Sequence, residues 1–346
     1  MKVATTIHRL HPKNLFTLSR GSKDYVDNVF LQLTDANGIM GLGEASPNSF
    51  YQETPTRIIE AIHRAKPFIS SLGQLDYASD QMPEITGQIW KYAYPSRAAQ
   101  CAIDLALWDL LAKRQNKSVC ELVWNHGPAP ISTFFTIAIC DPMDLPVRVR
   151  ETVQAQFLKV KVGSHTDPRI LDIIQESSTT RRAIDANGGF QPANFDRLLK
   201  IIHHQNLEFI EQPFSPEHDR QINQLRNQTN LPLLADESCV TLQDVERACE
   251  NFDGFNIKLV KCGGLTNGLA MLEQGIQHKK ITMVGCMLES SLSIAAGMVL
   301  AQKTNYADLD GSWLISDDPA TGLTLKEGFL HPAIDLAGYG VQLRFC

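Results

Sequence analysis

The sequence has no cysteine pattern typical of a disulfide-linked secreted domain or of a structural zinc site. Its eight cysteines form no Cys-x-x-Cys pair, and most of them lie inside apolar runs. Unpaired thiols in such runs are typical of a reducing compartment. We therefore expect neither a disulfide framework nor a cysteine-ligated zinc site.

Long apolar runs and an excess of positive charge are missing too. No run approaches the roughly 20 residues that a membrane helix needs, and the opening MKVATTIHRLHPKN has no apolar signal core. The net charge of −6 is spread along the chain, which argues against a binder of nucleic acids or anionic membranes. We expect a cytoplasmic protein that acts on a small molecule; the oligomeric state stays open, a homo-oligomer included.

Motifs of several enzyme classes are absent as well. There is no GxxxxGK[ST] phosphate-binding loop and no GxSxG nucleophile turn. The glycine-rich GIMGLGEAS closes a hairpin rather than opening a helix, so it does not fit a dinucleotide loop. What is present is a chain of 346 residues with 43% hydrophobic and 20% charged residues, which is long enough for a large core and about two domains.

The first third of the chain predicts an α+β domain. Residues 2–9 alternate like a strand, and two β-rich runs, 25–34 and 39–45, are joined through an Asn-Gly turn that is a strong hairpin signal. Residues 55–72 and 96–115 have helical patterns. The second of these is apolar on nearly all sides, so it must be deeply packed.

From about residue 131 the pattern changes to short β-type runs that alternate with amphipathic helices. Eight such units in near-regular succession predict a parallel β/α barrel, and an open doubly wound sheet is the alternative, although it usually has fewer strands. We expect a capping domain over 1–125, a barrel over 126–321 and a segment, 322–346, that forms a hairpin and returns to the cap. The strand candidates are 131–139, 157–163, 181–187, 207–213, 231–237, 254–260, 281–287 and 306–311.

Charged residues stand at the carboxyl ends of these strand candidates, which is where barrel enzymes place catalysis. They recur at intervals of roughly 25 residues, about one βα unit each, so we expect them at one height around one ring. Each alone has a plainer explanation, such as a helix N-cap or a solvated edge residue. In chain order they are Lys159 and Lys161, Asp185 with Asn187, Glu211, Asp236, Lys258, and Asp308 with Asp310.

Three of these residues, Asp185, Glu211 and Asp236, are carboxylates on consecutive strands. Converging without a counter-charge, they would repel one another unless a cation lay between them. Oxygen-only ligands favour a hard ion, so Mg²⁺ is the expected metal and Mn²⁺ a substitute. Lys161 precedes them by one strand and Lys258 follows by one strand, so the two lysines flank the metal.

Such a site suits the removal of a proton next to a carboxylate. The metal and the neighbouring Lys159 both disfavour the ammonium form of Lys161 and Lys258, so either lysine can act as a base near neutral pH. The ion would stabilise the developing enolate. With a base on each face, one lysine takes the proton and the other returns it, which inverts the carbon.

Together, the runs GLGEASP, LKVKVG, DANGG, IEQP, ADES and NIKLVKCGG resemble the enolase superfamily, muconate-lactonising subgroup, over nearly the whole chain. The resemblance implies an α/β fold, a modified (β/α)7β barrel under an N-terminal α+β capping domain. It implies Lys161 as one base, Lys159 as its auxiliary and Lys258 as the opposite base. The Mg²⁺ ligands that it implies are Asp185, Glu211 and Asp236, supported by Asn187.

Two further features narrow the substrate. Asp308 and Asp310 alternate on one strand candidate, so both would face the barrel mouth and want a cation, which a substrate ammonium supplies. The pair resembles the dipeptide epimerases, in which it holds the N-terminal amine; a capped loop is the plainer alternative. Arg20 in FTLSRGS is similar to a segment of the L-Ala-D/L-Glu epimerases, in which the arginine meets the glutamate side chain; an exposed loop arginine is the plainer alternative.

The resulting hypothesis is a Mg²⁺-dependent dipeptide epimerase, foremost of L-Ala-D/L-Glu from murein peptide turnover. The alternatives are a dipeptide epimerase for hydrophobic or cationic side chains, a lyase of the o-succinylbenzoate synthase or muconate cycloisomerase type, and a non-catalytic barrel that binds a partner. Lys261 is interpreted as structural or solvated. Tyr51 and Glu53 are candidate cap contacts, and Glu289 either lines the site or stabilises the barrel.

Overall fold

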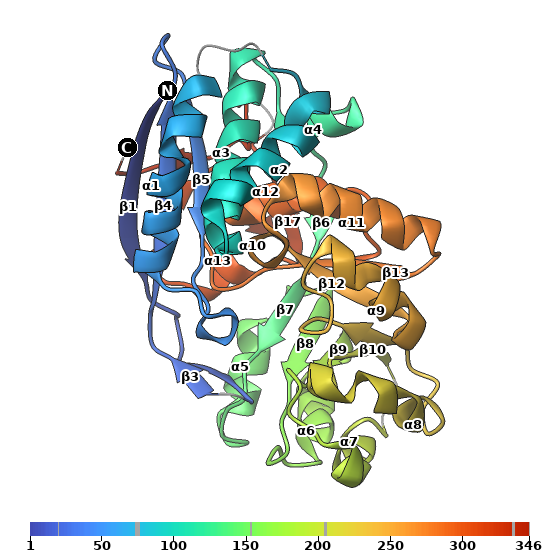
Figure 1. The fold of residues 1–346 in the computed structure, drawn as a ribbon. Helices are drawn as coiled ribbons and strands as arrows, with labels where there is room; N and C mark the ends of the chain where they lie inside the picture. Colours follow the sequence, from blue (N-terminus) through green and yellow to red (C-terminus); the bar gives the residue numbers. More distant parts are fainter. Residues whose placement is uncertain (20, 73–76, 153, 204–205, 334–335, 346) are drawn as a thin grey trace.

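The computed structural model describes residues 1–19, 21–72, 77–152, 154–203, 206–333 and 336–345 (Figure 1). The chain begins with an antiparallel sheet in the order β1-β4-β5, with helices packed beside it. We call this N-terminal part, through α4, the cap. Its main elements are β1 (Lys2–Leu10), β4 (Val26–Thr34), β5 (Met40–Ala45), α1 (Pro55–Leu72), α2 (Met82–Ala93), α3 (Arg97–Arg114) and α4 (Val119–Trp124).

The predicted hairpin and helices of the cap are confirmed. Strands β4 and β5 pair on either side of a turn that begins at Asp35, whose Oδ1 accepts hydrogen bonds from the backbone N–H of Asn37 and Ile39, each at 2.9 Å. Helix α3 is buried nearly all round, as its apolar sequence predicts. Gly43 allows β5 to lie against it, because a Cβ there would lie 2.0 Å from the carbonyl oxygen of Ala102.

A small second hairpin of the cap reaches toward the barrel (Figure 1). It consists of β2 (Phe16–Leu18) and β3 (Gly21–Lys23), and we call it the cap hairpin. The backbone N–H of Ile139, just beyond the first barrel strand, donates to the carbonyl oxygen of Thr17 at 3.0 Å. The cap hairpin is therefore hydrogen-bonded to the barrel at the carboxyl end of β7.

Eight parallel strands form the second part of the molecule, in the sequential order β7 to β14, as predicted. The two edge strands meet, because Thr133, just before β7, accepts a hydrogen bond at its Oγ1 from the N–H of Leu309, just after β14, at 2.8 Å. The sheet is therefore a barrel, and the alternative of an open doubly wound sheet is wrong. The strands are β7 (Phe134–Ile137), β8 (Phe157–Lys161), β9 (Arg181–Asp185), β10 (Leu207–Glu211), β11 (Leu233–Ala235), β12 (Gly254–Lys258), β13 (Ile281–Gly285) and β14 (Tyr306–Asp308).

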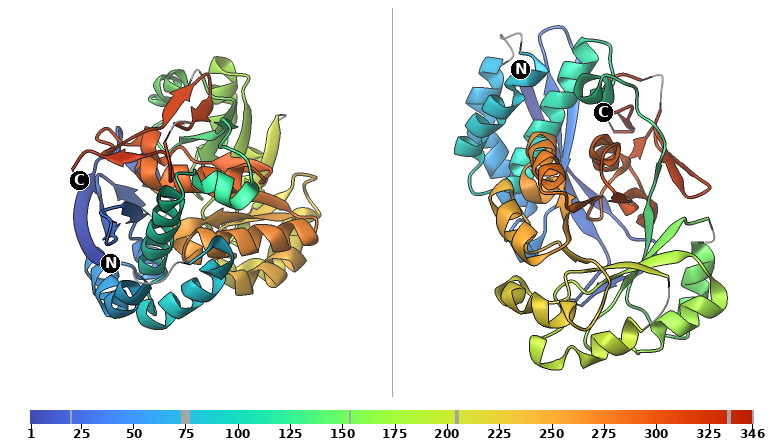
Figure 2. Two further views of the ribbon diagram at one scale, coloured as in Figure 1. Left: turned by 90° about the horizontal axis from the view of Figure 1, so that it is seen from above. Right: turned by 90° about the vertical axis from the view of Figure 1, so that its right-hand side faces the viewer.

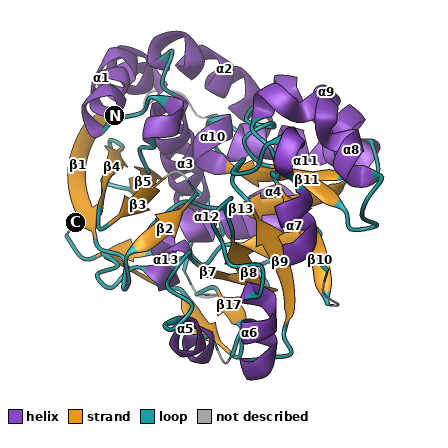
Figure 3. Cartoon of the chain, turned by 90° about the horizontal axis from the view of Figure 1, so that it is seen from below, coloured by secondary structure: helices purple, strands orange, loops and turns teal. Residues whose placement is uncertain are grey.

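Helices surround these strands, as the view from below shows (Figure 3). They are α5 (Leu145–Glu151), α6 (Ile170–Ser177), α7 (Asp196–Ile201), α8 (Ile222–Arg226), α9 (Val245–Asn251), α10 (Leu259–Cys262), α11 (Leu265–Gln277), α12 (Ser291–Ala301) and α13 (Gly311–Leu314). The strands are shorter than predicted, because the predicted ranges include loop residues and helix N-cap residues that follow each strand. Thus the predicted strand 306–311 ends at Asp308, and Asp310 is already the N-cap of α13.

The predicted C-terminal hairpin is present as β16 (Thr324–Lys326) and β17 (Phe329–His331), but β17 pairs with β6 (Ile131–Ser132) at the start of the barrel. The chain then reaches the cap, where β18 (Gln342–Leu343) pairs with β15 (Ala320–Thr321) and the ring of Phe345 stacks on His8 at 5.1 Å. Both chain ends lie on the cap side of the molecule (Figure 2). The exact domain boundaries stay a prediction.

None of the helices in the described ranges combines the length and the apolar character that crossing a bilayer would require.

Candidate active site

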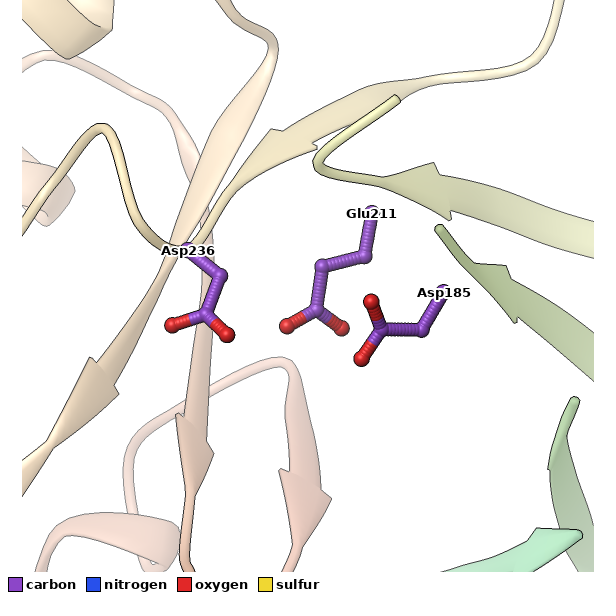
Figure 4. Close-up of side chains that lie close together, drawn as sticks. All are labelled: Asp185, Glu211 and Asp236. Atoms are coloured by element: carbon purple, nitrogen blue, oxygen red, sulfur yellow. The ribbon is translucent and has the colours of Figure 1, made fainter. Parts of the chain in front are cut away.

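Three carboxylates converge at the carboxyl ends of neighbouring barrel strands (Figure 4). Asp185 ends β9, Glu211 ends β10 and is its partner in the strand register, and Asp236 directly follows β11. All three side chains are buried, and one oxygen of each lies within 4.8 Å of the others. The parallel sheet thus brings together the three residues predicted as metal ligands, which are distant in sequence.

The charge on this cluster supports a cation site. Burial and the neighbouring charge of Asp185 raise the pKa of Glu211 to about 7, so the third carboxylate is held at an energetic cost. Burial also acts on Asp185 and Asp236, but the adjacent lysines outweigh it and hold the pKa of both below the ordinary range. The expectation that these carboxylates lack a counter-charge is wrong, because lysines lie beside all three. The three oxygen ligands are nevertheless the set that a hard divalent ion prefers, and they fit Mg²⁺.

Two lysines of β8 face the same interior, because alternate residues of a strand point the same way. Nζ of Lys161 lies 2.5 Å from Oδ2 of Asp185. Nζ of Lys159 is fully buried among three acids, 2.6 Å from Asp308, 2.7 Å from Glu211 and 3.1 Å from Asp185. Burial alone would lower the pKa of Lys159, but these carboxylates raise it well above its ordinary value.

Lys258 approaches the cluster from the other side, at the end of β12, with Nζ 3.1 Å from Oδ2 of Asp236. Burial and the charge of Lys159 lower its pKa, as expected from the sequence, but the attraction of Asp236 outweighs them and the net shift is upward. The protein's own charges therefore favour the protonated form of Lys258. A base at this position depends on an added positive charge beside Asp236.

Asp308 and Asp310 both line one cavity at the barrel mouth, although only the first of them belongs to a strand. Oδ2 of Asp310 accepts a hydrogen bond from the N–H of Thr136 at 2.6 Å. Burial and the charge of Asp308 raise the pKa of Asp310 to about 7. Lys159 holds Oδ2 of Asp308, but its Oδ1 is buried and accepts no hydrogen bond from the described residues, so one carboxylate oxygen is left for a further donor.

The same cavity reaches both predicted bases and one predicted metal ligand, while Asp185 and Glu211 lie beneath its surface. Its wall on the cap side contains apolar and polar residues of the cap hairpin and of the loop after β5. Charged and polar residues on the barrel side are Thr136, Lys161, Asn187, Asp236, Glu237, Lys258, Asp308 and Asp310. Cap residues that line the cavity are Phe16, Leu18, Lys23, Asn48 and Tyr51.

Of the cap residues that were predicted to contact the substrate, one lies at the cavity and one does not. Arg20 lies outside the described residues. Tyr51 lines the cavity, whereas Glu53 accepts hydrogen bonds from Ser96 Oγ at 2.8 Å and from the N–H of Ala98 at 3.2 Å, at the start of α3. Glu53 therefore caps helix α3. This helix begins more than 40 residues later in the chain, so no local sequence pattern reveals the contact.

Glu289 is buried beside the cavity but is not among the described residues that line it. Burial and the charge of Glu44 raise its pKa to about 8. Asn187 does lie at the cavity, with a positive φ of 44°, and its backbone N–H donates to Oδ1 of Asp185 at 2.9 Å. Lys23, three residues after Arg20, also lines the cavity and was not predicted to do so. The sequence feature that could have indicated it is a second cation in the same short segment.

Three polar residues hold the carboxylates; two of them were missed in the sequence, and the third, Lys261, was assigned no role at the site. The side-chain oxygen of Gln212 accepts from the N–H of Asp236 at 2.8 Å and of Ser238 at 3.0 Å. Nδ2 of Asn256 donates to Glu211 at 2.8 Å. Nζ of Lys261, interpreted above as structural or solvated, is buried and lies 2.5 Å from Oδ1 of Asp236.

Known proteins share this architecture. Residues 2–123 match the mandelate racemase / muconate lactonizing enzyme N-terminal domain, and residues 145–345 match the enolase C-terminal domain-like family. The chain is 33% identical over 349 residues to the L-Ala-D/L-amino acid epimerase of Flavobacterium johnsoniae, with 99% of this chain and 100% of the relative covered.

Two solved structures are similar over nearly their whole length. One is an enolase family member from Agrobacterium tumefaciens with homology to dipeptide epimerases, with bound sodium and L-Ala-L-Glu; it has a TM-score of 0.86 at 29% identity and covers 96% of this chain and 98% of its own. The other is the dipeptide epimerase of Enterococcus faecalis V583 complexed with Mg and L-Leu-L-Tyr, with a TM-score of 0.88 at 25% identity over 99% of each chain.

Proposed function

The chain belongs to the mandelate racemase / muconate lactonizing enzyme family of the enolase superfamily, and on this premise we propose that it is a dipeptide epimerase. The observation that carries the proposal is one cavity with two halves. One half has a lysine on either side of an acidic metal site, and the other has a further pair of carboxylates, of which Asp308 shares Lys159 with the metal site. A dipeptide matches both halves, because it carries a carboxylate at one end and an ammonium at the other.

In this proposal, Asp185, Glu211 and Asp236 hold Mg²⁺, with Mn²⁺ as a substitute. When bound, the ion supplies positive charge to the terminal carboxylate of the substrate, which acquires further negative charge as the α-proton leaves. Asn187 supports this site through its contact with Asp185. The convergence of three buried carboxylates, with the pKa of Glu211 raised despite Lys159 at 2.7 Å, supports a cation at this position.

Lys161 and Lys258 are the proposed bases for the α-carbon of the C-terminal residue. They approach the acidic cluster from Asp185 on one side and from Asp236 on the other. One lysine removes the proton from one face, and the other delivers a proton to the opposite face, so the configuration inverts. Lys159, between the acids, is the auxiliary that places positive charge beside Lys161.

Asp308 and Asp310 are proposed to hold the substrate ammonium. The raised pKa of Asp310 and the unpartnered Oδ1 of Asp308 among the described residues suit a cation better than the anionic groups of succinylbenzoate or muconate, so an epimerase is preferred to a lyase. Arg20 is proposed to meet an acidic side chain of the second residue, as in L-Ala-D/L-Glu. The apolar wall of Phe16 and Leu18 is the observation that keeps a hydrophobic second residue as the alternative.

A cytoplasmic role in murein peptide metabolism and assembly into a homo-oligomer belong to the same proposal. Neither is needed for the chemistry of the cavity.

The test is proton NMR of L-Ala-L-Glu incubated with the protein and Mg²⁺ in D₂O, with L-Ala-L-Leu and N-acetyl-L-Ala-L-Glu alongside. We expect loss of the α-proton signal of the second residue together with appearance of the L,D isomer, and no reaction of the N-acetylated peptide. Chelation should abolish both changes, and added Mg²⁺ or Mn²⁺ should restore them. Absence of deuterium incorporation into every free dipeptide tested, at saturating metal, would reject the proposal.

A further inference from the structure

The cluster contains a fourth lysine, Lys261, that holds Asp236 from outside the cavity. Its Nζ lies 2.5 Å from Oδ1 of Asp236 and 2.6 Å from the carbonyl oxygen of the same residue. The other carboxylate oxygen, Oδ2, lies 3.1 Å from Lys258. Asp236 and Lys258 line the cavity, whereas Lys261 is not among the described residues that do. The carboxylate is thus held between two lysines, with one oxygen assigned to each.

The spacing of the two lysines follows from one turn of helix. Lys258 is the last residue of β12 and the N-cap of α10, and Lys261 lies three residues later in that helix. Residues three apart lie on the same face of a helix. Because β11, which precedes Asp236, is the neighbour of β12 in the sheet, both side chains reach the same carboxylate.

The backbone that carries Lys261 is anchored to the cap. Helix α10 ends at two glycines with positive φ, and a Cβ on the second, Gly264, would lie 2.4 Å from Oδ2 of Asp104 in α3. Asp104 in turn accepts hydrogen bonds from Thr266, at the start of α11, through the N–H at 3.1 Å and the hydroxyl at 2.6 Å. The position of Lys261 is therefore fixed from both parts of the molecule.

We propose that Lys261 is a positioning residue for the metal site, which presents Oδ2 of Asp236 to the cavity by holding Oδ1 and the backbone oxygen. This inference rests on the proposed function, because it assigns Asp236 to a bound Mg²⁺. Lys261 is 3% exposed, and besides the two oxygen atoms of Asp236 its ammonium contacts the carbonyl oxygens of Cys239 at 3.2 Å and Asn256 at 3.5 Å. Burying a lysine there is costly, and an apolar side chain would serve packing alone equally well.

The variant Lys261→Met removes the ammonium and keeps the length of the side chain. We expect the dissociation constant of Mg²⁺, measured by titration calorimetry, to rise about 10- to 100-fold, because partners that orient metal ligands typically contribute that much. At saturating Mg²⁺, kcat for L-Ala-L-Glu should fall while KM stays within about twofold, since the carboxylates of Asp308 and Asp310 are untouched. The matched control is Lys280→Met, which loses a lysine contact to the carbonyl of Phe252, 2.8 Å long, near the other end of β12.

The sign of the change separates the competing explanations. A lysine that only neutralises charge would tighten Mg²⁺ binding when removed, and a purely structural lysine would lower the melting temperature with the Mg²⁺ constant unchanged. Either result, beside normal binding by the wild type, overturns the positioning role. Absence of Mg²⁺ binding by the wild type would instead reject the proposed metal site, and this inference with it.

A second variant covers the case in which Lys261→Met does not fold. Lys261→Gln keeps a hydrogen-bond donor without the charge, and we expect a smaller loss of Mg²⁺ affinity than for Lys261→Met. If neither variant yields folded protein while Lys280→Met does, Lys261 is a structural residue and the positioning role is overturned.

Discussion

The carboxyl ends of the barrel strands and the cap hairpin meet at one cavity but are built in opposite ways. On the barrel side, the charged groups are buried and the lysines pair with acids, as Lys159 among three acids illustrates. On the cap side, Phe16 and Leu18 are half-buried, and Gly21 and Ser22 are exposed. We infer from this difference that the buried barrel residues perform the chemistry. The more exposed cap hairpin can change without disturbing them, and can thereby change which substrate side chain is accepted.

The largest effect is expected from removing one base of the barrel. Lys258→Ala should reduce inversion of L-Ala-L-Glu about 10²- to 10⁴-fold, because proton transfer to one face is lost. Lys161 still reaches the other face, so one of the two isomers should continue to exchange its α-proton for deuterium without inverting. Proton NMR of the separate L,L and L,D peptides in D₂O measures both rates.

Lys280→Ala is the control for loss of a lysine near the other end of the same strand, and it should leave both rates unchanged. Full inversion by Lys258→Ala would contradict the two-base scheme.

An intermediate effect is expected at the carboxylate pair. Asp310→Asn removes the charge but keeps an oxygen that accepts the N–H of Thr136, now bound at 2.6 Å. A hydrogen bond to a charged group contributes roughly 1.5–3 kcal/mol, so KM for L-Ala-L-Glu should rise about 10- to 150-fold. The preference for the free amine over the N-acetylated peptide should shrink by a similar factor, as initial rates with both peptides will show.

The same change at Asp317, an exposed carboxylate paired with His11 away from the cavity, is the matched control. A KM for L-Ala-L-Glu that is equal in Asp310→Asn and Asp317→Asn would rule out the ammonium contact.

The same contrast explains how much could be read from the sequence. The periodic patterns predicted the eight strands, and the charges at strand ends predicted which side chains meet, because parallel strands bring their carboxyl ends to one ring. Local patterns could not reveal contacts formed between distant segments. Glu53 caps a helix that begins at Arg97, and Lys261 turns toward Asp236 rather than solvent.

Two further details depended on the exact course of the backbone. Asp310 was expected on the last barrel strand but lies at the start of α13, and still faces the cavity. A neutral Lys258 was expected beside a bound divalent ion, and the protein alone, through Asp236, raises the pKa of this lysine. Both reflect distances of a few ångströms, which spacing in sequence does not fix.

The smallest effect is expected on the cap side. Lys23, in β3, is the described cation of the cap hairpin that lines the cavity. Because it is partly exposed, its attraction for an acidic side chain is screened and contributes roughly 0.2–1 kcal/mol. Lys23→Met should therefore raise KM for L-Ala-L-Glu only about two- to fivefold, leave kcat and the melting temperature unchanged, and leave KM for L-Ala-L-Leu unchanged or lower.

The matched control is Lys13→Met, since Lys13 belongs to the cap segment just before the hairpin but lies over the ring of Trp313 and not at this cavity. High salt should weaken wild-type binding of L-Ala-L-Glu toward that of Lys23→Met, because screening acts on the exposed charge and much less on the buried barrel side. A loss of kcat in Lys23→Met comparable to that of Lys258→Ala would break the division between the two sides, since it would place the cap hairpin in the chemistry itself.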